Sequence, residues 1–315
     1  MEAPTYSAKQ VAELLGVKAR ELSSALKKDG YTPEDLWELR AKLERYPAAV
    51  GHRRQLFLNF KGGTGKTSLS TSYAWRLAER GYGVLLLDLD SQGHATKCLG
   101  YEGEQFERTL LDVLVKRVPI SQVIHQSSLP NLHFVASNLS MSTVDLSLMP
   151  MAGREFKLRN ALKEVEGNYD FIVFDAPPSF GLLNLNALMA ANDLFVPVLA
   201  DFLSFHGLKL LFETVQGLEQ DLDHVLDHVF VVVNAFNATF KLAKEALEAL
   251  QTHYPEYLLP TIIRQCTKFA QASSEGRPVF VSDGSSKGAQ DIEALLEHVV
   301  PRLAKAARKS ATRAS

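Results

Sequence analysis

The sequence has few cysteines and no long apolar run. Its 315 residues include only Cys98 and Cys266, which lie far apart and in no metal-ligand spacing. This excludes a disulfide framework and fits a reducing compartment. No apolar run reaches the roughly 20 residues that a membrane-spanning helix needs, and the N-terminus lacks a signal-peptide pattern. We therefore expect a soluble cytoplasmic protein.

The chain also lacks a strong charge of either sign. Lysine and arginine total 34, aspartate and glutamate total 36, and the net charge is -2. The molecule as a whole is therefore not an obvious binder of polyanions, and any affinity for nucleic acid must come from a local basic patch. Hydrophobic residues make up 46% of the chain, which is enough for one large core with or without an appendage.

Residues 1–50 differ in pattern from the rest of the chain. Ser7 is a candidate N-cap, apolar residues follow it at helical spacing, and Gly16 is expected to end the first helix. A second short helix and a third one starting at Pro33 are expected to follow. A helix, a glycine turn and a second helix are typical of a helix-turn-helix. We predict a small helical, helix-turn-helix-like module over residues 1–50 and a larger domain over residues 51–315.

The larger domain alternates between short apolar segments and helical ones. Apolar strands that alternate with helices predict a mainly parallel sheet covered on both faces. The fold class is therefore α/β, with a doubly wound sheet whose ligands bind at the carboxyl ends of the strands. The expected strands are 55–59, 83–88, 170–175, 194–198 and 229–234.

A glycine-rich segment at residues 61–68 connects the first strand to a helix. Its glycines let successive backbone N–H groups face a phosphate, and the helix N-terminus adds partial positive charge. Lys66 is then expected to span the β- and γ-phosphates of ATP, and the Thr67 hydroxyl to bind Mg²⁺. Asn234 ends a later strand and either reads the adenine base or forms a turn. The residues expected to bind ATP are Lys61, Gly62, Gly63, Thr64, Gly65, Lys66, Thr67, Ser68 and Asn234.

The spacing of this P-loop is unusual because a second lysine, Lys61, opens it. The run Lys-Gly-Gly-Thr-Gly-Lys-Thr at residues 61–67 resembles the deviant Walker A motif of the ParA/MinD group of ATPases. In that group the early lysine reaches across a dimer to the nucleotide of the other subunit, where a cation offsets charge on the phosphoryl group. The resemblance implies that Lys61 and Lys66 are catalytic and that hydrolysis depends on dimerisation.

Two further segments resemble motifs of the same family. Residues 84–96 are similar to its second motif, which implies that Asp90 positions or activates the attacking water and that Asp88 lies near the metal. Residues 169–179 look like its Walker B segment, which implies that Asp175 holds Mg²⁺ through water. The residues expected at the metal are Thr67, Asp88 and Asp175.

The resemblance covers about residues 54–300 and is looser in its last part. The chain has Phe60, Ser91 and His94 where family members usually have Gln, Pro and Asn. None of these differences removes a reactive group, so hydrolysis remains the expectation.

Within the family, the sequence favours the DNA-binding branch. Residues 301–315 contain only Leu303 as a large apolar residue, too little for a helix that inserts into a membrane. The cysteines do not supply the pattern of the iron–sulfur relatives. The resemblance then implies an ATP-dependent homodimer that binds DNA without sequence preference, associates with the nucleoid and is stimulated by a ParB-like partner. The candidate phosphate contacts, any of which could instead belong to a solvated surface, are Arg264, Lys268, Arg277 and Lys241.

The leading hypothesis is a ParA-type ATPase that drives partition or positioning of a plasmid, a chromosome region or a protein cluster. The alternative is an ATP-regulated transcriptional repressor that binds DNA through the N-terminal module. A third possibility is a metabolic P-loop enzyme that transfers phosphate to a small molecule. The basic C-terminal tail is either a flexible DNA contact or a soluble tail.

Overall fold

The computed structural model describes residues 3–201 and 203–314, apart from the side chains of residues 203, 206, 219 and 310–314. An eight-stranded sheet runs through it in the order β3-β4-β2-β5-β1-β6-β7-β8. Only the β3–β4 pair is antiparallel, and the other neighbours are parallel. The strands are β1 Arg53–Phe57, β2 Val84–Asp88, β3 Ile124–Gln126, β4 Leu132–Val135, β5 Phe171–Asp175, β6 Asp193–Leu199, β7 His228–Phe236 and β8 Leu258–Arg264.

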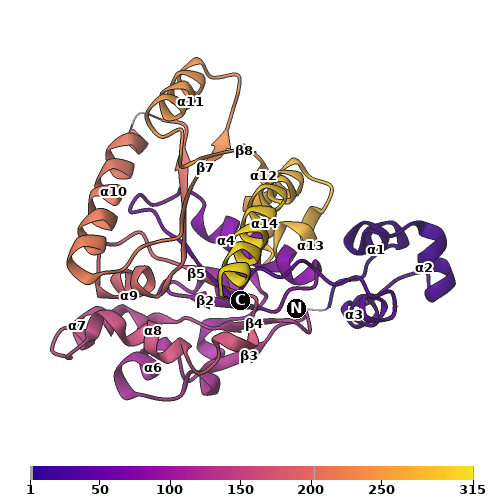
Figure 1. The fold of residues 1–315 in the computed structure, drawn as a ribbon, viewed down its shortest axis with the longest axis horizontal. Helices are drawn as coiled ribbons and strands as arrows, with labels where there is room; N and C mark the ends of the chain where they lie inside the picture. Colours follow the sequence, from indigo (N-terminus) through magenta and orange to yellow (C-terminus); the bar gives the residue numbers. More distant parts are fainter. Residues whose placement is uncertain (1–2, 202, 315) are drawn as a thin grey trace.

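Helices cover both faces of this sheet (Figure 1), which confirms the doubly wound α/β fold. The helices of the larger domain are α4 Lys66–Glu79, α5 His94–Cys98, α6 Leu110–Lys116, α7 Val144–Leu148, α8 Lys157–Leu162, α9 Leu182–Ala190, α10 Leu203–Leu222, α11 Lys241–His253, α12 Thr267–Ser274, α13 Val279–Asp283 and α14 Lys287–Ala314. In the described part of the chain, we find no helix with the length and apolar character that a membrane crossing requires.

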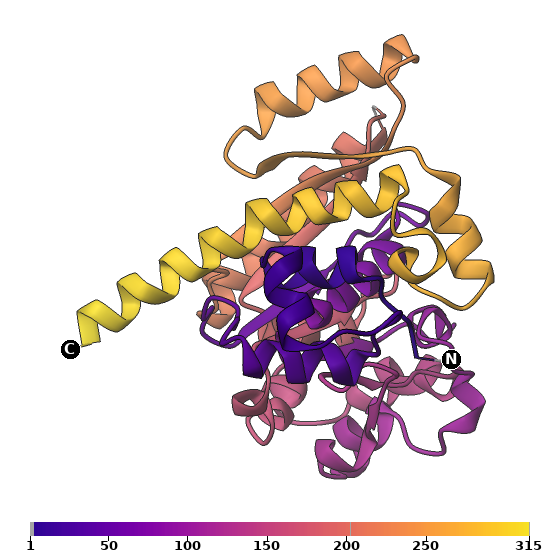
Figure 2. The ribbon, with the colours of Figure 1, turned by 90° about the vertical axis from the view of Figure 1, so that its right-hand side faces the viewer.

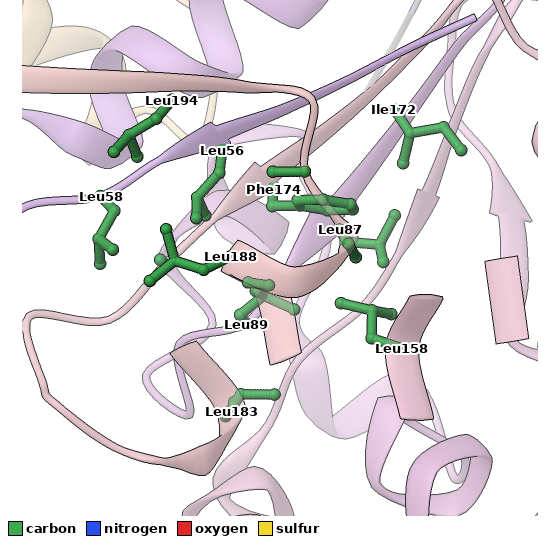
Figure 3. Packing of buried hydrophobic residues seen from close by; sticks show 14 of the residues in the cluster. Leu56, Leu58, Leu87, Leu89, Leu158, Ile172, Phe174, Leu183, Leu188 and Leu194 are labelled. Atoms are coloured by element: carbon green, nitrogen blue, oxygen red, sulfur yellow. The ribbon is translucent and has the colours of Figure 1, made fainter. Parts of the chain in front are cut away.

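Consecutive residues of the central strands point to opposite faces, and both faces are buried. Leu56 and Phe174 belong to the core under α6 to α10, and Figure 3 shows them packed near Leu188. Phe57 and Val173 belong to the other core, under α4 and α14. This explains why these strands consist of uninterrupted apolar residues.

Residues 3–45 form a module of their own, composed of α1 Ala8–Leu15, α2 Ala19–Ala25 and α3 Pro33–Lys42. Ser7 caps α1 by accepting from the Gln10 N–H, and Gly16 ends it with a φ of 63°. Both expectations are therefore confirmed.

The module is fixed to the C-terminal end of α4. Its Tyr6 hydroxyl donates to Glu79 Oε1 at 2.9 Å, and the guanidinium of its Arg40 donates to Glu79 O at 3.0 Å. The connecting segment also touches the larger domain, because Val50 is buried in the core under α4. The module is thus joined to the very helix that follows the glycine-rich segment.

The C-terminal residues are helical in the structure. Helix α14 continues through Pro301 to Ala314. Figure 2 shows its last turns extending beyond the rest of the molecule. The basic segment after Pro301 is thus part of a long helix.

Candidate active site

The glycine-rich segment lies between β1 and α4, at the carboxyl edge of the sheet. Gly63 and Gly65 have φ values of 73° and 89°, which residues with a Cβ rarely adopt. A Cβ on Gly65 would also lie 2.1 Å from the Asn234 amide nitrogen, whereas one on Gly62 or Gly63 would meet nothing within 4 Å. Glycine is therefore required at Gly65 by both conformation and space.

Asn234 supports this loop from behind. Its Nδ2 donates to Thr64 O at 2.7 Å, and the side chain is buried. It lies within β7, beside a register irregularity between Val233 and Phe236, so it does not form a turn of its own. An adenine contact stays a prediction, and the observed contact is to the phosphate loop.

The two lysines of the loop lie in different surroundings. Lys66 is buried and donates to Lys61 O at 3.3 Å, and burial lowers its pKa against the opposing effects of Asp175 and Asp90. The Lys61 side chain lies at the rim, one third exposed (33%), with its Nζ 2.8 Å from Asp201 Oδ2. One lysine therefore faces the loop interior, and the other is held beside it.

Asp175 ends β5 directly opposite the start of α4. It is fully buried, and its two oxygens accept from the Thr67 hydroxyl at 2.8 Å and the Ser70 hydroxyl at 2.9 Å. Burial raises the pKa of Asp175 to about 6, although both hydroxyls favour the charged form. Ser70 was not expected at the site. Its position one helical turn after Thr67 was the available signal.

Asp88 ends β2 and pairs in register with Asp175. Its Oδ2 accepts from the backbone N–H and the hydroxyl of Thr96 at 2.8 and 2.7 Å, and its Oδ1 accepts from the Asp90 N–H at 3.2 Å. Burial and the nearby Asp175 raise the pKa of Asp88 to about 8. Asp88 thus holds both ends of the loop that carries Asp90, and Thr96 is a further participant that sequence reasoning missed.

The residues that meet here fit a magnesium–nucleotide ligand. The Thr64 hydroxyl is buried and has no hydrogen-bond partner among the described residues, as expected of a polar group that a ligand would satisfy. Thr67 and Asp175 supply hard oxygen ligands of the kind that Mg²⁺ prefers. Those two residues would hold the metal, and Lys66 with the loop N–H groups would hold the phosphates. Bound Mg²⁺ neutralises charge on the phosphate oxygens.

An apolar groove of about 370 Å³ adjoins the loop. Phe60 packs edge-on against Phe180 of the segment after β5, with 5.0 Å between the ring centroids. Phe60 therefore links the phosphate loop to the segment that follows Asp175.

Comparison with known proteins agrees with this site. A family model described as an AAA domain (AAA_31) matches residues 55–228. The cell division protein PomZ of Myxococcus xanthus is 79% identical over 313 residues, which cover 99% of this chain and 98% of that protein. The sporulation initiation inhibitor protein Soj of Bacillus subtilis is 33% identical over 232 residues, 74% of this chain and 92% of Soj. The chain belongs to the ParA/MinD family of P-loop ATPases.

Solved structures agree with this family assignment. Cobyrinic acid a,c-diamide synthase from Mycobacterium smegmatis, with a bound ATP analogue and magnesium, is 28% identical and superposes with a TM-score of 0.65 over 78% of this chain and 95% of that one. An ATP complex of an McdA variant from Cyanothece shares the fold, with a TM-score of 0.71 at 21% identity over 80% of this chain and 96% of that one. The protein is an ATP hydrolase of the ParA/MinD family, and its cofactors are ATP and Mg²⁺.

The candidate DNA contacts lie on and around β8, α11 and α12, and three of the four have carboxylate partners. Arg264 Nη2 lies 2.7 Å from Asp291 Oδ1. Lys268 lies 3.6 Å from Asp283, and Lys241 lies 3.5 Å from Glu245. Arg277 is exposed after the end of α12. Their role in DNA binding stays a prediction, and the carboxylates reduce the positive charge that this region presents.

Proposed function

We propose that this ATPase works as an ATP-dependent sandwich dimer that binds DNA without sequence preference and positions a cargo along it. Two subunits would enclose two nucleotides, and Lys61 of each subunit would contact the nucleotide of the other, as in a deviant Walker A motif. A ParB-like partner would stimulate hydrolysis and release the dimer from DNA. The protein would then be cytoplasmic and associated with the nucleoid.

The different surroundings of the two loop lysines carry this proposal. Lys66 is buried inside the loop and is available to a nucleotide in the same subunit. Lys61 is partly exposed at the rim, and a modest ion pair holds it away from the loop interior. A rim lysine can contribute positive charge to a second active site, where such a cation strongly accelerates phosphoryl transfer.

The names of the relatives favour positioning in cell division or chromosome partition. PomZ is a cell division protein, and a 30% identical relative from the same organism is a chromosome partitioning protein, ParA. The similarity to PomZ covers 99% of the chain, at 79% identity, and therefore includes the N-terminal module. We therefore place positioning in cell division ahead of chromosome partition as the function of this protein.

The test measures self-association and ATP turnover together. The full-length protein should sediment as a dimer with a slowly hydrolysed ATP analogue and as a monomer with ADP. Random duplex DNA should bind only in the analogue-bound state, and turnover should increase when DNA and the partner are both added. Lys61→Ala should retain nucleotide binding but lose stimulated turnover. A Lys61→Ala protein with normal stimulation would refute the action in trans.

A repressor that acts through the N-terminal module is the second candidate. The exposed residues of α2 include Lys18 at its start, Arg20 and Ser23, which suit contacts to a duplex. Sequence-specific binding of a discrete operator, unaffected by Lys61→Ala and lost on substitution of Arg20, would favour that function over positioning.

A further inference from the structure

We propose that the C-terminal half of α14 binds the phosphate backbone of duplex DNA through one row of cations. The row consists of Arg302, Lys305 and Lys309 and is called here the α14 ridge. The inference rests on the proposed DNA-binding function and adds a contact surface outside the region of β8 and α12.

The ridge is presented by a helix whose opposite side is fixed to the protein. Leu303 and Ala304 are buried in the core under α4 and α14, and the Ala307 methyl group lies 3.5 Å from where a Cβ on Gly51 would be. Residues 302, 305 and 309 are spaced i, i+3 and i+7, which places them on a common helical face. All three ridge side chains are exposed. The ridge therefore faces solvent, on the side of α14 opposite to its packed residues.

The charge of this segment is of one sign. The sequence contains no aspartate or glutamate after Glu297, whereas residues 298–315 contain Arg302, Lys305, Arg308, Lys309 and Arg313. Within the described side chains, no ion pair involves the three ridge residues. Arg264, Lys268 and Lys241, by contrast, each have a carboxylate within 4 Å. Cations without acidic neighbours keep their full attraction for a phosphate chain.

The surroundings of the ridge favour DNA over a membrane. Leu303, the large apolar residue of this segment, faces the core and is 1% exposed. A surface-binding membrane helix needs a wide apolar face in addition to its cations. Figure 2 shows the end of α14 projecting past the other elements, where a rigid duplex can approach it. Side chains that contact only phosphates supply affinity without reading the base sequence.

The test compares two variants of the full-length protein with equal changes in charge. The ridge variant carries Arg302→Gln, Lys305→Gln and Lys309→Gln. The control variant carries Arg108→Gln, Arg117→Gln and Lys163→Gln, three exposed cations outside the phosphate loop that, like the ridge, form no ion pair with the described side chains. Binding to a random-sequence duplex is measured by fluorescence anisotropy with the ATP analogue over a series of salt concentrations. Basal ATPase activity and circular dichroism check the fold of both variants.

The expected result is a change in salt dependence that is specific to the ridge. A plot of log K against log salt has a negative slope, and each lost phosphate contact should make it less steep by about 0.9. The slope of the ridge variant should therefore be less steep than that of the wild type by roughly two to three units. The control variant should keep the wild-type slope. A ridge variant that binds like the control would overturn the ridge and leave the proposed function intact. Absence of DNA binding by the wild type would overturn both.

A second experiment, with lipid vesicles, distinguishes the phosphates of DNA from the phosphates of lipid headgroups as the ligand of the ridge. Vesicles of phosphatidylglycerol and phosphatidylcholine, matched to the DNA in phosphate concentration, should retain little of the wild-type protein. Ridge-dependent binding to these vesicles that equals the binding to DNA would overturn the assignment to nucleic acid.

Discussion

Lys61 and Asp201 form an ion pair within a single chain, with 2.8 Å between Nζ and Oδ2. Asp201 also accepts from the N–H of Ser204 near the start of α10. A lysine held in its own subunit cannot at the same time contact a nucleotide in another. If Lys61 acts in trans, this pair must open when two subunits meet, and Asp201 therefore opposes dimerisation.

Asp201→Asn should strengthen ATP-dependent dimerisation. Asparagine keeps an oxygen that can accept from Ser204 but removes the charge that attracts Lys61. Because each pair is partly exposed and contributes at most about 1 kcal/mol, and two such pairs open in each dimer, the dimer should become roughly four- to thirtyfold tighter. Sedimentation with the ATP analogue measures this constant. Asp221→Asn, on the exposed side of α10, is the matched control. An unchanged or weaker Asp201→Asn dimer would contradict the restraint.

Asn234→Ala should weaken nucleotide binding by way of the phosphate loop. The substitution removes the 2.7 Å hydrogen bond to Thr64 O, and a hydrogen bond of about 0.5–1.5 kcal/mol corresponds to roughly a two- to twelvefold loss of affinity. Loop support predicts the same loss for ATP, GTP and inorganic triphosphate. A loss confined to ATP would instead show that Asn234 reads adenine. Asn237→Ala, in the half-buried start of the segment after β7, should leave all three affinities unchanged.

The central strands could be predicted from the sequence because each is apolar on both faces. The outer strands could not. β8 contains Pro260 and alternates between buried and more exposed residues, as an edge strand does, so it lacks the continuous apolar run that marks the central strands. β3 has three residues and gives almost no pattern. An edge strand forms because it pairs with an adjacent strand, and a single sequence does not show which strand that is.

The residues of the site also fall into those that could be predicted from the sequence and those that could not. Thr67, Asp88 and Asp175 could be predicted to converge because the carboxyl ends of parallel strands share one edge. Ser70 and Asp201 could not be assigned, since their partners are 105 and 140 residues away in the chain. The helical spacing of Ser70 from Thr67 was a signal, but it became informative only when the fold placed Asp175 beside both hydroxyls. An aspartate before a helix, such as Asp201, has no sequence signature of its own.

Asp88 should make the nucleotide-free protein less stable as the pH rises. Its folded pKa of about 8 lies well above the ordinary value for aspartate, so the folded state binds this proton more tightly than the unfolded state. The resulting stabilisation is complete below about pH 4 and is lost as the pH rises toward 8. Asparagine at position 88 does not titrate. The difference in melting temperature, Asp88→Asn minus wild type, should therefore increase between pH 5 and 8. A difference that stays constant or falls over this range would contradict the raised pKa.

Arg40→Ala should loosen the N-terminal module from the ATPase domain. The Arg40 side chain is 4% exposed and donates to Arg45 O at 2.8 Å and Glu79 O at 3.0 Å. Burial lowers its pKa to about 10. Without the guanidinium these carbonyls lose their partner, at a cost of about 1–3 kcal/mol for each one that stays buried. We expect faster proteolysis within residues 46–51 and a melting temperature lower by a few degrees.

The control for this prediction is Arg20→Ala, on the exposed side of α2 in the same module. It should be cleaved at the wild-type rate. A fragment released from Arg40→Ala by cleavage before Val50 should keep its two sheet cores, because Val50 belongs to the core under α4 and the core of the module is separate from both. A fragment that still binds ATP would place the domain boundary at the connecting segment. Equal cleavage of the two variants would show that Tyr6 and the other contacts hold the module without Arg40.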